Sequence, residues 1–344
     1  MKLILPLLLG LTFLPAGFAA DAGADILTNP TAHAWKIFNE INQQVPNDPE
    51  GRVVWETWKL GREVFADPAH APVWNPAAPA ARTKATFESE PLQQLVRQLR
   101  LQGHAAGPMK PQFDGGSGNE TRLNKATFDF IVNNDLYYAQ GIEAFAKAGK
   151  KFDFPKASME IKAQWRPIKP ADASHYHTAK VIENGQEKVW GLTALHITTK
   201  ELPNWFWATF EHKDNPAREG VLKDVQPQDQ PPEFHGTKWE NYVIRGTQTE
   251  FTDSIGRPTR LANSQIEAGF QQTSSCISCH ALATVNWKEP DPEGIKSLPF
   301  FDDSGNGSLG TPKPGLFLAP GSSDQMRFQQ MDFVWSFFRA QRRP

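Results

Sequence analysis

The feature that most constrains this chain is a five-residue motif in its last quarter, Cys276-Ile277-Ser278-Cys279-His280. Two cysteines separated by two residues and followed by histidine are the signature of covalent c-type haem attachment. The thiols form thioether bonds to the porphyrin, and the imidazole supplies the proximal iron ligand. The 344-residue chain contains 2 Cys in total, so we expect one covalent haem c, with no thiol left for a disulfide or a zinc site.

A redox-active dithiol is the alternative interpretation of two cysteines at this spacing. Such a pair lies early in a βαβ unit. Here the pair lies late in the chain, after Thr273-Ser274-Ser275, and histidine follows it directly. The sequence therefore favours haem attachment, with Cys276 and Cys279 as the attachment sites and His280 as the iron ligand.

The N-terminus predicts a secretory signal peptide over residues 1–22. Lys2 forms a short positive region, residues 3–13 are apolar, and small residues follow between Ala16 and Ala24. A membrane-spanning helix needs about 20 apolar residues, and this run is interrupted at Pro15 and Gly17. We therefore expect an exported, periplasmic protein with no membrane span in the mature chain. An uncleaved anchor is the alternative.

Composition argues against a nucleic-acid partner and for several packed cores. Lys and Arg number 36 against 38 Asp and Glu, a net charge of −2 that does not indicate binding to nucleic acid or to an anionic membrane. The 11 Trp and 23 Phe indicate aromatic-rich cores, and 28 Pro with 25 Gly indicate long connections. The length predicts two or three domains.

The hydrophobic pattern changes twice along the chain and predicts an α+β multidomain protein. Residues 23–150 have mostly helical spacing, with candidate helices near 34–41, 53–60, 92–99 and 120–148. Residues 151–255 alternate with a period of two, and Asn184-Gly185 lies between two such runs, which predicts an antiparallel sheet or small sandwich. Residues 256–344 return to helical spacing.

The last region resembles a class I cytochrome c domain, which is all-α. The resemblance covers residues 256–344 and rests on three features: the haem motif, a Pro/Gly-rich loop, and a terminal helix that would carry Phe328, Met331, Val334, Trp335 and Phe338. The whole layout is similar to a group of exported single-haem bacterial proteins. That similarity rests on Gly246-Thr247-Gln248, Leu261-Ala262-Asn263-Ser264 and Met331-Asp332-Phe333-Val334-Trp335-Ser336. It implies the order of the domains and no activity.

The resemblance to cytochrome c implies a distal methionine ligand. Only Met326 and Met331 lie between His280 and Trp335. Met326, at the start of the predicted terminal helix, is the candidate distal ligand, whereas Met331 on the apolar stripe is expected in the core. A histidine ligand and an open iron position are the alternatives.

Other polar groups are weaker candidates for a site. His196 and His212, with Glu211, occur in aromatic strands, where they would bind a metal, lie over the haem, or serve as hydrogen-bonded structural residues. His175 and His177 belong to a predicted loop. Residues 302–307 match the start of a calcium loop, but Lys313 stands where its bidentate glutamate belongs, which favours a solvated turn.

These features favour the first of three functions, and the other two are its alternatives. The first is periplasmic one-electron transfer through the haem, with a redox partner protein. The second is a haem-dependent oxidoreductase, such as an oxidase or peroxidase, and the third is a gas or redox sensor; in both, the N-terminal domains would cover an open distal site. The sixth iron position distinguishes the carrier from the other two.

Overall fold

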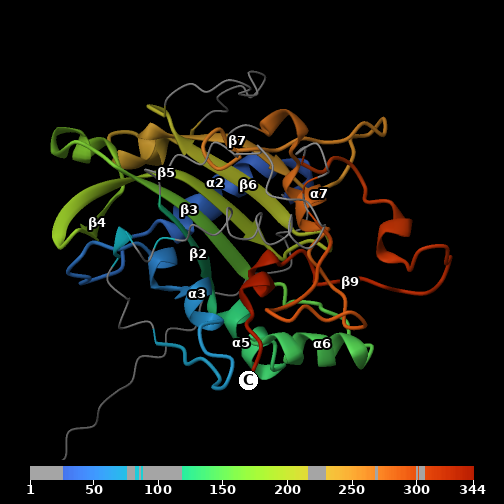
Figure 1. Cartoon of the computed structure of the whole chain (residues 1–344). Helices are drawn as coiled ribbons and strands as arrows, with labels where there is room; N and C mark the ends of the chain where they lie inside the picture. The colour runs from blue at the N-terminus through green and yellow to red at the C-terminus, as the bar shows by residue number, and fades with distance from the viewer. Residues whose placement is uncertain are drawn as a thin grey trace, which may run out of the picture.

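A large antiparallel sheet organises the chain in the computed structural model, which describes residues 26–75, 82–84, 87, 118–215, 230–267, 270–299, 301 and 307–344. Within these ranges the sheet has seven strands in the order β1-β2-β3-β5-β6-β7, and β4 pairs with β5 (Figure 1). The strands are β1 (Lys59–Leu60), β2 (Gly118–Leu123), β3 (Met159–Pro167), β4 (Thr178–Glu183), β5 (Gln186–Thr199), β6 (Phe206–His212) and β7 (Tyr242–Gln248).

The antiparallel sheet predicted for residues 151–255 is confirmed, as one sheet and not a sandwich in the described part. Asn184 and Gly185 form the β4–β5 turn with φ of +52° and +75°, the paired left-handed geometry of a tight hairpin. Two strands from the region predicted as helical, β1 and β2, extend this sheet. The signal peptide over residues 1–22 and the helix near 92–99 lie outside the described residues.

The first predicted helix is confirmed as α2 (Pro30–Ile41), which packs on the apolar face of the sheet. Asn29 caps it by accepting a hydrogen bond from the Ala32 N–H at 3.1 Å, and Pro30 occupies the first turn. Trp35 and Phe38 contact Phe210 of β6 with ring centroids 4.9 and 4.4 Å apart. These aromatic contacts fix α2 against the middle of the sheet.

Further helices lie at one end of the sheet, beside the C-terminus (Figure 1). They are α3 (Gly61–Val64), α5 (Lys125–Asn133) and α6 (Ala139–Lys147). Asn124 caps α5 and also accepts a hydrogen bond from the Met159 N–H at 3.1 Å, which joins the helix to the start of β3. The Ala139 N–H donates to the Gln341 carbonyl at 2.9 Å, so the chain end contacts α6.

The prediction of an all-α, cytochrome c-like domain over residues 256–344 is wrong. Its described part contains a one-turn helix α7 (Cys276–His280) and a two-stranded ribbon of β8 (Thr284–Val285) and β9 (Gln329–Gln330). It also contains the 3-10 turns η6 (Gln271–Thr273), η7 (Pro314–Phe317) and η8 (Trp335–Arg339). The fold is therefore mixed, with the large antiparallel sheet at its centre.

The predicted terminal helix is interrupted for a local reason. Residues 329–330 pair with β8, and Asp332 and Phe333 follow with φ of +50° and +67°, a left-handed conformation that ends any helix. The residues with helical spacing, such as Met331 and Phe338, are nevertheless buried. An irregular chain here buries the same apolar side chains that the helix was expected to bury.

Short 3-10 turns complete the described elements: η1 (Val54–Thr57), η3 (Pro170–His175), η4 (Pro232–Phe234) and η5 (Lys238–Asn241). None of the helices within the described ranges has the length and apolar content that a membrane crossing requires.

Candidate functional site

The polar face of the sheet and the C-terminal region enclose a cavity with about 1080 Å³ of empty space, part of it open to solvent. Cys276, Cys279 and His280 all lie in its wall. The opposite wall comes from four strands: Thr121 of β2, Glu160 and Lys162 of β3, His196 and Thr198 of β5, and Trp207 and Ala208 of β6. The haem motif therefore faces the sheet and not a helical domain.

Helix α7 is held against the end of β7. Ser275 caps it, and its hydroxyl accepts a hydrogen bond from Nε2 of Gln248 at 2.7 Å. Oε1 of Gln248 in turn accepts from the Ile277 N–H at 3.0 Å, and the Ile277 side chain is fully buried. Because the buried Gln248 bonds to both the Ser275 hydroxyl and the Ile277 N–H, the orientation of the haem motif is fixed relative to the sheet.

The geometry of His280 suits a metal ligand. Its Nδ1 lies 2.7 Å from the carbonyl oxygen of Phe333, and an imidazole nitrogen beside a carbonyl must donate. Burial lowers the pKa of His280 to about 4, so the ring is neutral near neutral pH. A neutral ring with hydrogen on Nδ1 leaves the Nε2 lone pair for a metal, and such a carbonyl partner is typical of ligating histidines.

The partner carbonyl belongs to a strained turn. Asp332 and Phe333 both have left-handed φ angles, which for residues other than glycine cost on the order of 1–3 kcal/mol each. The Asp332 carboxylate accepts from Nζ of Lys200 at 2.6 Å and from the Phe154 N–H at 2.8 Å. These two contacts hold the turn, and thereby the Phe333 carbonyl, beside His280.

The two thiols are unlike those of a redox dithiol. Burial raises the pKa of Cys276 well above its ordinary value and that of Cys279 to about 12. Reactive cysteines need a lowered pKa, because the thiolate is the nucleophile. The environment of the two thiols therefore argues against the dithiol alternative.

The sheet wall of the cavity is rich in ionisable groups that the sequence did not single out. Burial raises the pKa of Glu160 to about 7, although Arg339 and a hydrogen bond with Ser336 oppose the rise. Among the residues that the structure describes, its Oε1 has no hydrogen-bond partner. Arg339 donates to Thr121 Oγ1 at 2.9 Å. The alternation in β3 placed Glu160 and Lys162 on one face, but it did not reveal what covers that face.

Of the two strand histidines singled out earlier, only His196 belongs to this site. His196 lies in the cavity wall, and its Nε2 is 3.1 Å from Oε1 of Glu267. Burial opposes ionisation of Glu267, but the charge and hydrogen bond of His196 hold the pKa of Glu267 below its usual value. Nε2 of His212 instead donates to the His175 carbonyl at 3.0 Å, and its ring stacks on Tyr176.

The remaining candidates do not form a site. Glu211 accepts hydrogen bonds from the N–H and the hydroxyl of Ser264, and it forms an ion pair with Arg245. His175 is exposed, and residues 302–306 of the calcium-loop candidate lie outside the described ranges. Across the part of the chain that the structure describes, no three His, Cys, Asp or Glu side chains converge as a bare metal ion requires.

The two methionines lie apart from the haem motif. Met326, the candidate distal ligand, is 47% exposed and lies in the wall of a second cavity. Met331 is fully buried in the core beside α6, as its place on the apolar stripe predicted. The structure therefore does not bring Met326 together with Cys276, Cys279 and His280.

These two methionines form a matched pair for a stability measurement. Met331→Ala is expected to lower the free energy of unfolding by about 2–5 kcal/mol, because it leaves a cavity in a packed core. Met326→Ala removes the same atoms from an exposed side chain and should change the free energy of unfolding by less than about 0.5 kcal/mol. Urea denaturation followed by tryptophan fluorescence measures both. Equal effects of the two substitutions would contradict the assigned packing.

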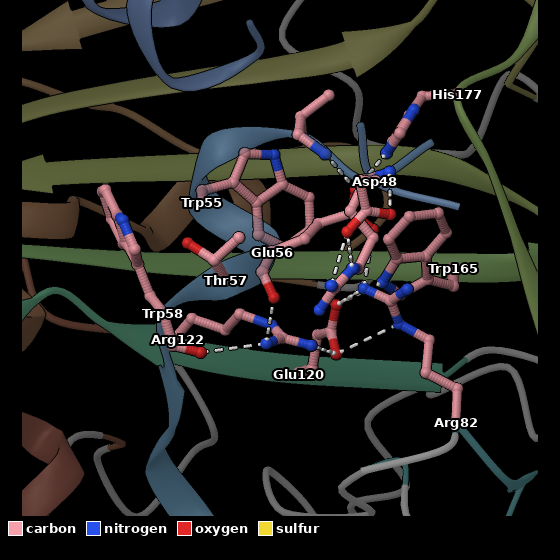
Figure 2. Close-up of polar contacts among 12 residues, drawn as sticks. Asp48, Trp55, Glu56, Thr57, Trp58, Arg82, Glu120, Arg122, Trp165 and His177 are labelled. Carbon is pink, nitrogen blue, oxygen red and sulfur yellow. Dashed lines mark hydrogen bonds and ion pairs between the residues drawn. The ribbon is translucent and has the colours of Figure 1, made fainter. Parts of the chain in front are cut away.

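Figure 2 shows a second group of buried ionisable residues, on the apolar face of the sheet. Nη2 of Arg82 lies 2.8 Å from Oε1 of Glu56 and 2.8 Å from Oε1 of Glu120. Nη2 of Arg122 lies 3.1 Å from Oε2 of Glu120. Nε2 of His177 lies 2.9 Å from Oε2 of Glu56. We call these five residues the buried charge cluster. Glu120 and Thr121 are neighbours on β2, so their side chains point to opposite faces and the cluster is separated from the haem motif by the sheet.

The buried charge cluster is structural. Nζ of Lys238 donates to Nδ1 of His177, so Nε2 of that ring carries the hydrogen donated to Glu56. Burial lowers the pKa of His177, in agreement with a neutral ring. Two carboxylates then face two guanidinium groups, and the contacts join η1, residues 82–84, β2 and η5.

Comparison of this chain with models of protein families, with curated proteins and with solved structures finds no match.

Proposed function

We propose that this chain binds one haem c through Cys276 and Cys279, with His280 as proximal ligand, and is an exported haem-dependent oxidoreductase. One observation carries the proposal: the three motif side chains share a cavity with ionisable sheet residues and with no methionine among the lining residues described. When bound, the haem would supply one-electron chemistry and an iron site for a small oxidant or gas.

The chain's own residues would serve such a ligand in distinct ways. Glu160, with a pKa of about 7, holds or releases a proton near neutral pH. Lys162 and Arg339 bring positive charge to the same wall, where low polarity strengthens their attraction for an anionic or polar ligand. The His196–Glu267 pair adds a second hydrogen-bonding group.

One-electron transfer is the second candidate, and a specific observation favours it. His196 provides a second imidazole in the wall of the same cavity as His280. With His280 and His196 both as iron ligands, the protein would carry electrons without binding a substrate at the metal.

The spectrum of the purified ferric protein separates the two. For the oxidoreductase we expect a high-spin spectrum and cyanide binding that saturates within seconds. His196→Ala should leave the spin state unchanged, as should His175→Ala, which removes an exposed imidazole outside the cavity. A low-spin spectrum that becomes high-spin in His196→Ala but not in His175→Ala would overturn the oxidoreductase and establish the carrier.

A further inference from the structure

A second cavity lies between α6, the segment before β3, and β9, and its wall includes Phe333, whose carbonyl oxygen contacts His280. It has about 1950 Å³ of empty space, part of it open to solvent. Lys147, Lys151 and Lys156 lie in its wall, and Lys150 lies beside them in the chain. We call these four residues the lysine rim.

The positive charge of the lysine rim is not neutralised within the described part of the chain. All four lysines are exposed, and none forms an ion pair with a described residue. One exposed carboxylate, Asp153, lies among them, 3.4 Å from the buried Lys200. The lysines of the β4–β5 hairpin are paired, Lys180 with Glu187 and Lys188 with Glu183, so the unpaired charge of the lysine rim differs in its concentration within ten residues. A concentration of unpaired charge attracts an oppositely charged partner.

The wall of the second cavity also contains apolar side chains. Met326 is 47% exposed, and Trp287 and Phe333 are partly exposed in the same cavity wall. Apolar side chains surrounded by charged ones are the usual arrangement of a transient protein interface. The lysine rim and these apolar side chains together form a surface suited to a protein with acidic residues around its own contact point.

Phe333 connects this surface to the haem motif. Its side chain lies in the wall of the second cavity, and its carbonyl oxygen is 2.7 Å from Nδ1 of His280, whose ring faces the first cavity. Trp207 packs on His280 with ring centroids 4.5 Å apart. Phe333 would therefore be the residue between a partner bound at the lysine rim and His280. Such a partner would not cover the cavity wall that β3 and β5 form.

We propose that the lysine rim docks an acidic one-electron redox protein, which exchanges electrons with the haem from the proximal side. This inference rests on the proposed haem. One electron leaves the reduced centre of the partner, which is oxidised by one unit, and ferric haem becomes ferrous. No bond forms or breaks, and no proton is required.

Binding is tested first, on the full-length chain with and without haem, with fluorescently labelled polyglutamate as the probe. At low ionic strength, Lys147→Glu with Lys151→Glu should weaken binding roughly tenfold, because exposed charges steer association at close range. Lys180→Glu with Lys188→Glu changes the net charge equally and should weaken it less than about twofold. Equal weakening by the two double variants would overturn the docking surface.

The site of electron entry is tested by stopped-flow reduction with small charged reductants. In the Lys147→Glu, Lys151→Glu variant, reduction by the anionic iron(II)–EDTA complex should slow and reduction by cationic hexaammineruthenium(II) should accelerate, each roughly tenfold. The Lys180, Lys188 variant should show neither change. Unchanged rates in a haem-loaded protein would overturn this inference alone, whereas a chain without a haem spectrum would overturn the proposed function instead.

A membrane is the other partner that the binding test distinguishes. Vesicles of phosphatidylglycerol should not bind better than polyglutamate at equal ionic strength. If vesicles bind in a rim-dependent manner and polyglutamate does not, the surface recognises lipid and the docking of an acidic protein is overturned.

Discussion

The double substitution Cys276→Ser with Cys279→Ser is expected to abolish the covalent attachment of haem. Thioether bonds require the thiols, and the chain has no other cysteine to replace them. The wild-type chain should retain its haem through acid-acetone extraction and stain for haem after denaturing electrophoresis, and the double variant should do neither. The expected change is from about one haem per chain to none.

A substitution within the same turn provides the control. Ser278→Ala lies between the two cysteines and leaves both thiols and His280 in place, so it should keep the haem stain. Far-ultraviolet circular dichroism checks that all three proteins contain the same sheet. Haem that leaves the wild-type chain in acid-acetone, or that stays with the double variant, would contradict covalent attachment.

Glu120→Gln is expected to lower the free energy of unfolding by about 3–5 kcal/mol, because it leaves buried charge without a counter-ion. The Glu120 carboxylate accepts from Arg82 and Arg122 and from Nε1 of Trp165 at 3.1 Å (Figure 2). Glutamine keeps the shape but removes the charge. Guanidinium denaturation followed by fluorescence measures the loss.

The pH dependence of stability provides a second measurement of the same residue. Burial opposes ionisation of Glu120, but Arg122 and Arg82 lower its pKa to about 2, below the ordinary 4.5. A carboxyl group with a lowered pKa stabilises the fold above the unfolded-state pKa, and this contribution is lost as the pH falls from about 4.5 towards 2. Glu120→Gln should flatten this part of the curve.

Glu187→Gln is the matched control for the buried charge cluster. Glu187 is half-exposed on β5 and pairs with the exposed Lys180, and such surface pairs contribute less than about 1 kcal/mol. A loss in Glu120→Gln no larger than that in Glu187→Gln would show that the buried charge cluster does not hold the fold together.

Local patterns predicted the elements whose environment is itself local. Asn29 and Pro30 mark the start of α2, and a helical apolar face follows directly. The alternation from Met159 onwards predicted β3, and Asn184-Gly185 predicted the hairpin. In each case the residues that decide the structure lie within a few positions of one another.

The errors have a common cause in long-range contacts. Strand β2 contains one apolar side chain, Leu123, yet all six of its residues are buried, and distant residues contact its polar side chains: Arg82 pairs with Glu120, and Arg339 donates to Thr121. The spacing of Phe328, Met331 and Phe338 fits a helix, but pairing of residues 329–330 with β8 overrode it. The ionisable wall of the cavity was not predicted for the same reason, since the polar side of β3 appears solvent-facing from its sequence alone.

Residues near the C-terminus complete the cavity by contacting segments that lie much earlier in the sequence. Arg339 and Thr121 are 218 residues apart in the sequence, and Asp332 and Phe154 are 178 apart. Contacts of such long range form late, because loop closure must precede them. We expect the face of the sheet that carries Glu160 and Lys162 to stay open to water until the last residues dock. Ionisable side chains keep that unfinished face hydrated, where an apolar face would lead to aggregation.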